Sequence, residues 1–298
     1  MSVMNSEKYK FIDLFAGIGG FHLALSDLGA ECVFAAEIDR HARKTYEENF
    51  KRHNEELFAG VNFASDISDV DPAQVPEFDI LCAGFPCQPF SQAGYKKGFQ
   101  DSNNNRGNMF FEIVRFLKTK RPPAFFLENV RHLKNHDDGR TFETIKNTLE
   151  ELGYSFYFNI VKASDFGLPQ HRPRIFMVGF LDDSEKSFEF AQPQPLEMFM
   201  SDVFGEPCNK SIGYTLRVGG RGSGLNDRRN WDTYMVNGRQ LRLNSEAGKK
   251  MQGFPANFRF PVSETQAMKQ LGNSVAVTAV RATAKQIIGY LNDRQQQK

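Results

Sequence analysis

The sequence predicts an α/β protein with a doubly wound, mostly parallel sheet and a small, irregular second domain. Two observations support this fold. Strand-like and helix-like segments alternate five times along the first half of the chain, and this alternation stops after about residue 184. The length of 298 residues suits one to two domains. A hydrophobic content of 40% with 24% charged residues excludes a largely disordered chain.

The individual elements follow from hydrophobic periodicity. We expect buried strands at 9–15, 32–36, 61–67, 78–85 and 124–130. Helical apolar spacing occupies 21–28, the segment that runs to Asn49, 109–118 and 141–152. Two further strands, 154–161 and 174–181, are predicted to be adjacent and antiparallel, and 264–291 returns to a helical pattern that we expect to pack on the sheet.

The second domain is assigned to residues 182–258, which carry Pro, Gly and Arg with little periodicity, and the larger domain to 1–181 plus 259–298. The formal charge of +1 neither favours nor excludes a nucleic-acid partner. It hides an asymmetry, because residues 1–80 carry a net charge of −8 and residues 209–250 a net charge of +6. Such a basic segment is often a solvated loop, but it can also bind phosphates.

Targeting and redox signals are absent from the sequence. No apolar run approaches the roughly 18 residues of a membrane span, and Met1–Lys10 is polar. The four cysteines are too few for a disulfide scaffold and lack zinc-type spacing. We therefore expect a cytoplasmic protein with no membrane contact and no bound metal.

Polar or reactive residues stand at the end of every predicted parallel strand. Ligands of open α/β sheets bind outside these carboxyl ends. The ends carry Asp13, Glu37, Asp66, the segment Gly84–Cys87 and the pair Glu128–Asn129.

The glycine turn after the first strand predicts a nucleoside ligand without a pyrophosphate. It differs from the dinucleotide fingerprint, because His22 replaces the third glycine and no phosphate-binding Lys is evident. Glu37 lies 17 residues after Gly20, where an acid could bind ribose hydroxyls. The turn alone is equally consistent with a purely structural role.

Cys87 is the candidate nucleophile. It follows a strand end between Pro86 and Gln88-Pro89, in a stiff loop at the ligand-binding edge, whereas Cys82 lies inside a strand and is expected to be a core residue. Glu128 ends the neighbouring strand. A buried acid there would have a raised pKa and could donate a proton, although a capping or salt-bridged acid is the alternative.

Five segments occur in an order that resembles the cytosine-5 DNA methyltransferases of bacterial restriction–modification systems. They are Asp13–Gly20, Gly84–Gln88, Glu128–Val130, Gln170–Arg174 and Gly272–Val275. The resemblance covers nearly the whole chain and implies S-adenosylmethionine as cofactor, with S-adenosylhomocysteine as product. It implies cofactor contacts from Phe15, Ala16, Gly17, Ile18, Gly19, Gly20, Glu37, Ile38, Asp66, Ile67, Gly84, Pro86, Asn273 and Ser274.

The resemblance also implies covalent catalysis on a cytosine flipped out of the duplex. The Cys87 thiolate would add to C6, and Glu128 would hydrogen-bond or protonate N3. Arg172 and Arg174 would complete the catalytic set, with Arg174 near the base.

Residues 182–258 lie where this family has its target-recognition domain, and the partner is then double-stranded DNA. Thr215-Leu216 resembles a pair that the family often shows there. The predicted DNA contacts are Gln88, Ser91, Arg217, Gly219, Gly220, Arg221, Arg228 and Arg229. Because arginine reads guanine well, we expect a short G/C-containing palindrome. The resemblance also implies that the protein acts as a monomer and is functionally paired with a cognate restriction endonuclease.

The chain departs from the family pattern at Leu241, Ala247 and Lys250, which replace an Arg, a Glu and an Arg. Because this motif mainly organises the recognition domain in the family, the departures concern domain packing and specificity more than chemistry. Three alternative functions fit the sequence less well. A tRNA methyltransferase of this superfamily would carry a Cys-Phe-Thr tripeptide, which is absent. A non-catalytic DNA-binding descendant should have lost Cys87 or Glu128, and a nicotinamide oxidoreductase should have the third glycine.

Overall fold

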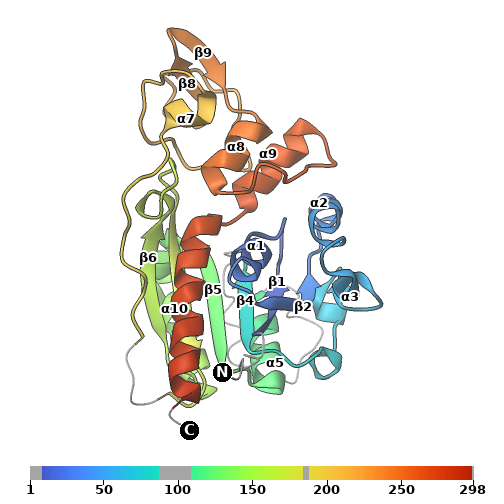
Figure 1. Ribbon diagram of the computed structural model, residues 1–298. Coiled ribbons are helices and arrows are strands. Elements are labelled where there is room, and N and C mark those ends of the chain that lie inside the picture. Colours follow the sequence, from blue (N-terminus) through green and yellow to red (C-terminus); the bar gives the residue numbers. More distant parts are fainter. Residues whose placement is uncertain (1–8, 87–108, 184–187, 297–298) are drawn as a thin grey trace, which may run out of the picture.

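The computed structural model describes residues 9–86, 109–183 and 188–296. Its centre is a seven-stranded sheet in the order β3-β2-β1-β4-β5-β7-β6 (Figure 1). The strands are β1 (Lys10–Leu14), β2 (Glu31–Ala36), β3 (Phe63–Ala64), β4 (Ile80–Gly84), β5 (Ala124–Val130), β6 (Tyr157–Lys162) and β7 (Pro173–Phe180).

The pairing confirms the predicted fold class. Strands β1 to β5 are parallel, β7 is antiparallel to β5, and β6 is antiparallel to β7. The predicted adjacency of the last two strands is therefore also confirmed. Because β1 lies between β2 and β4, the strand order reverses at β1, and ligands of such sheets bind beside that switch point.

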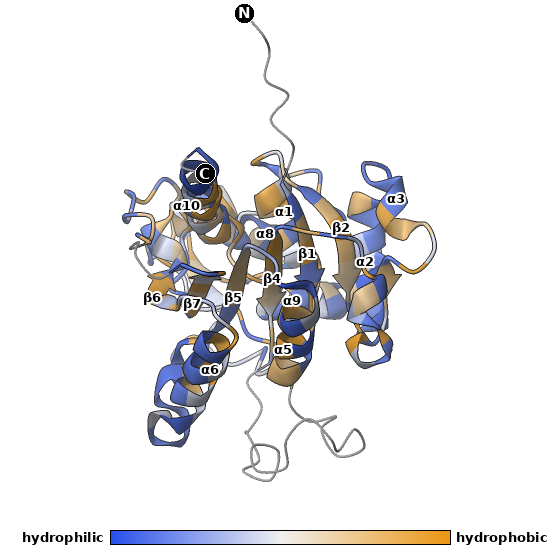
Figure 2. Cartoon of the chain, turned by 90° about the horizontal axis from the view of Figure 1, so that it is seen from below, coloured by the Kyte–Doolittle hydropathy of each residue, from blue (hydrophilic) through white to orange (hydrophobic). Residues whose placement is uncertain are grey.

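Helices cover both faces of the sheet (Figures 1 and 2). They are α1 (Gly20–Ser26), α2 (Arg40–Phe50), α3 (Glu55–Phe58), α5 (Met109–Lys120), α6 (Arg140–Glu151) and α10 (Val277–Gln295). A further helix, α9 (Glu264–Asn273), lies beyond the ends of the strands (Figure 1). Alternate strand residues point to opposite faces. Phe11 and Phe126 belong to the apolar cluster that contains residues of α1 and α10, whereas Ile12 and Phe125 belong to the cluster of α5 and α6.

Two predicted elements differ in the structure. The third strand, expected over 61–67, is only Phe63–Ala64, because the Asp66 carboxylate accepts from the Ser68 main-chain N–H and caps a 3₁₀ turn. The single helix expected over 264–291 is two helices. Ser274 is extended, and its carbonyl and that of Gly272 accept hydrogen bonds from Arg172.

The second region contains more regular structure than its sequence indicated. It holds α7 (Met200–Phe204), the hairpin of β8 (Thr233–Val236) and β9 (Arg239–Arg242), and α8 (Ser245–Gln252). Asn237 and Gly238 join the hairpin with φ angles of 46° and 74°, as a type I′ turn requires. Its buried Leu216, Trp231 and Tyr234 belong to the same apolar cluster as α1 and α10, and the domain boundaries remain a prediction.

No helix in the described parts of the chain is long and apolar enough to cross a membrane.

Candidate active site

A cleft of about 820 Å³ opens at the carboxyl ends of β1, β2, β4 and β5. Its opposite wall is formed by residues 215–218 and by α9. The cleft brings together most of the described residues that the sequence assigned to cofactor binding and catalysis. These are Phe15, Gly17, Ile18, Glu37, Ile38, Asp66, Ile67, Gly84, Pro86, Glu128, Arg172, Arg174 and Asn273, and the predicted DNA contact Arg217 joins them.

The glycine turn after β1 has a backbone that few residues tolerate. Phe15 and Gly17 have φ angles of 58° and 56°, and a left-handed Phe stores strain of about 1–3 kcal/mol. Gly19, at φ 86°, has a second constraint, because a Cβ there would lie 2.2 Å from the Phe50 ring of α2. Close packing and unusual φ angles together explain the glycine pattern.

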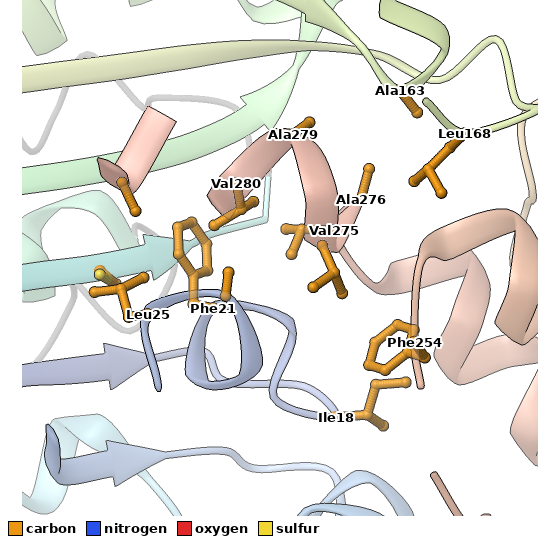
Figure 3. Packing of buried hydrophobic residues seen from close by; sticks show 14 of the residues in the cluster. Ile18, Phe21, Leu25, Ala163, Leu168, Phe254, Val275, Ala276, Ala279 and Val280 are labelled. Atoms are coloured by element: carbon orange, nitrogen blue, oxygen red, sulfur yellow. The ribbon is translucent and has the colours of Figure 1, made fainter. Parts of the chain in front are cut away.

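Three predicted cofactor residues, Ala16, Gly19 and Gly20, lie behind the cleft wall. A Cβ on Gly20 would lie 2.5 Å from the Val275 side chain and 3.3 Å from the Ser274 hydroxyl. Figure 3 shows Ile18 close to Val275 and Phe254 at the junction with the C-terminal part of the chain. Ser274 therefore packs against the turn, whereas Asn273 lines the cleft.

Glu37 connects the glycine turn to the start of α2. Its Oε2 accepts the Gly17 main-chain N–H over 2.8 Å and its Oε1 accepts the Asp39 N–H over 2.7 Å. Burial raises the pKa of this carboxyl, and the two N–H donors oppose that effect. Each oxygen keeps a further lone pair, so a diol could still bind.

Ile38 lies beside this carboxyl with 71% of its surface exposed, although it is apolar. Both Ile38 and Asp66 line the same end of the cleft as Glu37. This surface suits a nucleoside, because it combines an exposed aliphatic side chain (Ile38) with two carboxylates (Glu37 and Asp66) that can accept hydrogen bonds.

Glu128 and Arg174 form an ion pair at the cleft. Arg174 Nε donates to Glu128 Oε1 over 2.9 Å, and both side chains are largely buried. In the sheet Glu128 is in register with Gly84 of β4, and a Cβ on Gly84 would lie 3.5 Å from Glu128 Oε2. Burial raises the pKa of Glu128, and Arg174 and Arg172 partly offset that rise.

Asn129 was placed at a strand end from the sequence but received no role there, and the structure shows its contacts. Its Nδ2 donates to the Phe85 carbonyl over 2.9 Å, and its Oδ1 accepts the Val130 N–H over 2.8 Å. Phe85 lies two residues before Cys87. The predicted residues Cys87, Gln88 and Ser91 lie outside the described part of the chain.

Arg172 has contacts that suit a positioning role. It is 2% exposed, and its guanidinium donates to the carbonyls of Leu216 over 3.2 Å, Gly272 over 3.0 Å and Ser274. Gln170 adds to this junction, because its Oε1 accepts the Leu216 N–H over 2.9 Å. The catalytic role predicted for Arg172 stays a prediction.

The four predicted recognition arginines fall into two groups. Arg221 Nε lies 3.5 Å from the buried Asp232 carboxylate, and Arg221 also donates to the Leu243 carbonyl over 2.8 Å. Arg229 is paired with Asp227 over 2.8 Å. Arg217 and Arg228 are exposed and have no hydrogen-bond or ionic partner among the described residues.

Trp231 and Asp232 also fix the glycines between these arginines. Trp231 Nε1 donates to the Gly219 carbonyl over 3.0 Å, and Asp232 Oδ2 accepts the Gly222 N–H over 3.2 Å. Gly220, with φ 78°, turns the chain between them. These contacts show how Gly219 and Gly220 shape the segment, while their predicted DNA contacts remain untested.

The departures from the family pattern lie on β9 and α8. Ala247 is buried and Lys250 Nζ donates to the Val203 carbonyl over 3.3 Å. One residue earlier at each position, Glu246 and Lys249 form an ion pair of 2.7 Å. An acid–base pair therefore does occur on α8, one residue before the positions that the family pattern uses. Nothing in the structure explains Leu241.

The sheet and the cleft at its strand ends define a Rossmann-like methyltransferase fold. Solved structures of DNMT2 from Spodoptera frugiperda, as a mutant, and of Dnmt2 from S. pombe match 94% and 96% of this chain and all of their own chains. Both have a TM-score of 0.70 and 18% identity. At this identity they support the fold alone.

The family model described as C-5 cytosine-specific DNA methylase matches residues 9–219 and 210–289. The Type II methyltransferase M.NlaX of Neisseria lactamica is 42% identical, with 94% of this chain and 96% of the relative covered. M.HhaI of Haemophilus parahaemolyticus is 36% identical, with 95% of each covered. The chain belongs to the C-5 cytosine-specific DNA methylase family and is a DNA cytosine-5 methyltransferase.

Proposed function

We propose that this enzyme transfers a methyl group from S-adenosylmethionine to C5 of a cytosine flipped out of a short, specific site in duplex DNA, through a covalent Cys87 adduct at C6. The observation that supports it best is the position of the Glu128–Arg174 pair. It lies in the same cleft as Glu37 and the glycine turn, and at the end of the strand that pairs with β4, which precedes Cys87 in the sequence.

The residues of the cleft fit the proposed cofactor. Glu37 would bind the ribose hydroxyls with the lone pairs that Gly17 and Asp39 leave free. Ile38 would cover one face of the adenine, and Asp66 would accept from its amino group. The turn has no lysine for a pyrophosphate, which suits an adenosine that carries none. Bound there, S-adenosylmethionine supplies an electrophilic methyl group.

The remaining chemistry belongs to side chains of the protein. Cytosine C5 is a poor nucleophile, so the Cys87 thiolate first adds to C6 and makes C5 enamine-like. Glu128 holds or protonates N3, and Arg174 both orients that carboxyl and limits the rise in its pKa. C5 would then take the methyl carbon as its bond to the cofactor sulfur breaks, so S-adenosylhomocysteine would be the leaving group. Loss of the C5 proton to a base and expulsion of the Cys87 thiolate restore the ring and the nucleophile.

The base must leave the helix for a thiol to reach C6. The exposed Arg217 lines the same cleft as Glu128, and we propose that a flipped nucleotide enters beside it. We propose that the enzyme acts as a monomer in the bacterial cytoplasm and protects host DNA from a cognate restriction endonuclease.

The test is expression in a host that lacks cytosine methylation, followed by chemical-conversion sequencing of its genome. Methylation at one short context, absent in a Cys87→Ser strain, would support the proposal. The purified Cys87→Ser variant should still bind S-adenosylmethionine. Full activity in that variant would rule out the covalent mechanism, and unmodified DNA from folded, cofactor-binding protein would rule out duplex DNA as substrate.

A further inference from the structure

A group of exposed basic side chains lies at or beyond the ends of β5 and β6, on the sheet side of the cleft. It consists of Arg131, His132 and Lys134, which directly follow β5, and Lys162, which ends β6. None was selected as a DNA contact from the sequence. We call these four residues the strand-end strip.

The sheet register places these residues together. Val130 of β5 and Val161 of β6 are both in register with Arg174 of β7. Arg131 and Lys162 are the next residues beyond that row, on either side of β7. Since neighbouring strands lie about 4.8 Å apart, their backbones are separated by roughly 10 Å.

A side-chain contact shows which face of the sheet Lys134 occupies. Lys134 Nζ lies 4.9 Å from the ring centroid of Phe158, which is on β6 four residues before Lys162. Phe158 and Lys162 have the same parity along the strand and therefore point to the same face. Lys134 and Lys162 thus lie on one side of the sheet, the side of α6.

Among the described residues, no ion pair involves the strip. Arg131, His132 and Lys162 have no ionic partner there. The nearby acids Asp137 and Asp138 both pair with Arg140. In Figure 2, α6, which follows this segment, projects away from the sheet and is drawn mainly in blue for hydrophilic residues.

The strip adjoins the site. Val130, which immediately precedes Arg131, lines the cleft together with Glu128 and Arg174, while Arg217 lines the facing wall. Exposed basic side chains therefore follow directly after one lining segment of the cleft, and Arg217 lines the facing wall. A polyanion that enters the cleft would meet positive charge from each wall.

We propose that Arg131, Lys134 and Lys162 bind backbone phosphates of the DNA duplex, as a second wall opposite the recognition region. The inference rests on the proposed function, because it takes duplex DNA as the substrate. Flexible, exposed cations that contact phosphates position the duplex but carry no sequence information. Their contribution should therefore be electrostatic and independent of sequence.

The experiment measures the binding of a labelled, mixed-sequence DNA duplex between about 50 and 200 mM salt. The test variant is Arg131→Gln with Lys134→Gln and Lys162→Gln. Each phosphate contact contributes about 0.9 to the slope of log K against log salt, so the slope should fall in magnitude by about two to three. The matched control removes three exposed cations elsewhere, through Lys44→Gln, Arg52→Gln and Lys285→Gln, and should change it by less than about one.

If the test variant and the control variant have equal slopes, the strip does not bind phosphates, and the proposed function is unaffected. Wild-type protein that binds S-adenosylhomocysteine but no duplex DNA would overturn both. S-adenosylhomocysteine binding also reports on folding of the triple variant. If that variant does not fold, the single variant Lys162→Gln tests the phosphate contacts instead. Its slope of log K against log salt should fall in magnitude by about one, whereas the slope for Lys285→Gln should not change.

Discussion

The Asn129 side chain donates to the main-chain carbonyl of Phe85 over 2.9 Å, and this bond ties the end of β5 to the end of β4. Both groups are buried. Asn129 follows the catalytic acid candidate Glu128, and Phe85 precedes Cys87 by two residues. The amide thus fixes the spacing between the strand that carries the acid and the start of the loop that carries the proposed nucleophile.

Replacing Asn129 by Ala should therefore slow methyl transfer more than it weakens substrate binding. A misplacement of about 1 Å between reacting groups can cost about 100-fold in rate. We expect a fall of about 10- to 100-fold in kcat, measured by single-turnover methylation of a duplex that contains the site. Asn135→Ala, an exposed asparagine in the following turn, is the control. A parallel rise in KM with unchanged kcat would contradict this role.

Replacing Glu37 by Ala should weaken cofactor binding specifically. The change removes the proposed acceptor for the ribose and also frees the Gly17 and Asp39 N–H groups that Glu37 accepts. Loss of two charge-assisted hydrogen bonds predicts a rise in the Kd for S-adenosylmethionine of at least about tenfold. Calorimetric titration measures it, with Glu56→Ala as the exposed control. Equal losses of cofactor and DNA affinity would argue against the ribose contact.

Arg217 and Arg221 should respond differently to truncation. Arg221→Ala removes a partner of the buried Asp232 and a donor to Leu243, so unfolding free energy should fall by about 1.5–3 kcal/mol. Arg217→Ala should leave stability unchanged and weaken binding of the cognate duplex by about 1–3 kcal/mol if it reads a base. Urea denaturation and fluorescence anisotropy separate the two effects. If Arg217→Ala is less stable than Arg221→Ala, then Arg217 and not Arg221 has the structural role.

The sequence predicted the sheet and most of the cleft because both depend on local patterns. Apolar runs ending in Asp13, Glu37 or Glu128 specify a strand and the polar residue at its end, and parallel pairing then brings such ends to one edge. The predicted residues that line the cleft come from these short segments.

Contacts between distant segments could not be predicted in the same way. The pairing of Arg221 with Asp232 joins two positions in a region without periodicity, so all four recognition arginines looked equivalent in sequence. The helix break at Ser274 depends on capture of its carbonyl by Arg172, 102 positions away. The hairpin at Asn237-Gly238 is different, because that dipeptide is a strong turn signal and could have been used.

Asp13, at the end of β1, should make stability depend on pH. Both carboxylate oxygens are buried without a hydrogen-bond partner among the described residues, although the His22 main chain lies near. Burial raises the pKa of Asp13 well above its usual value, and the charge of Glu37 raises it further. The folded state therefore keeps this carboxyl neutral at a pH where the unfolded chain has already ionised it.

The sign of the effect follows from that difference. Stability due to the neutral form is complete below the unfolded pKa of about 4 and is lost as pH rises toward the folded value, by up to about 1.4 kcal/mol per pH unit. Asp13→Asn removes the titration while preserving shape. Its stability relative to wild type should therefore increase from pH 5 to pH 8 in urea denaturation. The exposed control Asp69→Asn should show no such trend, and a pH-independent difference for Asp13→Asn would mean that Asp13 is already ionised in the folded protein.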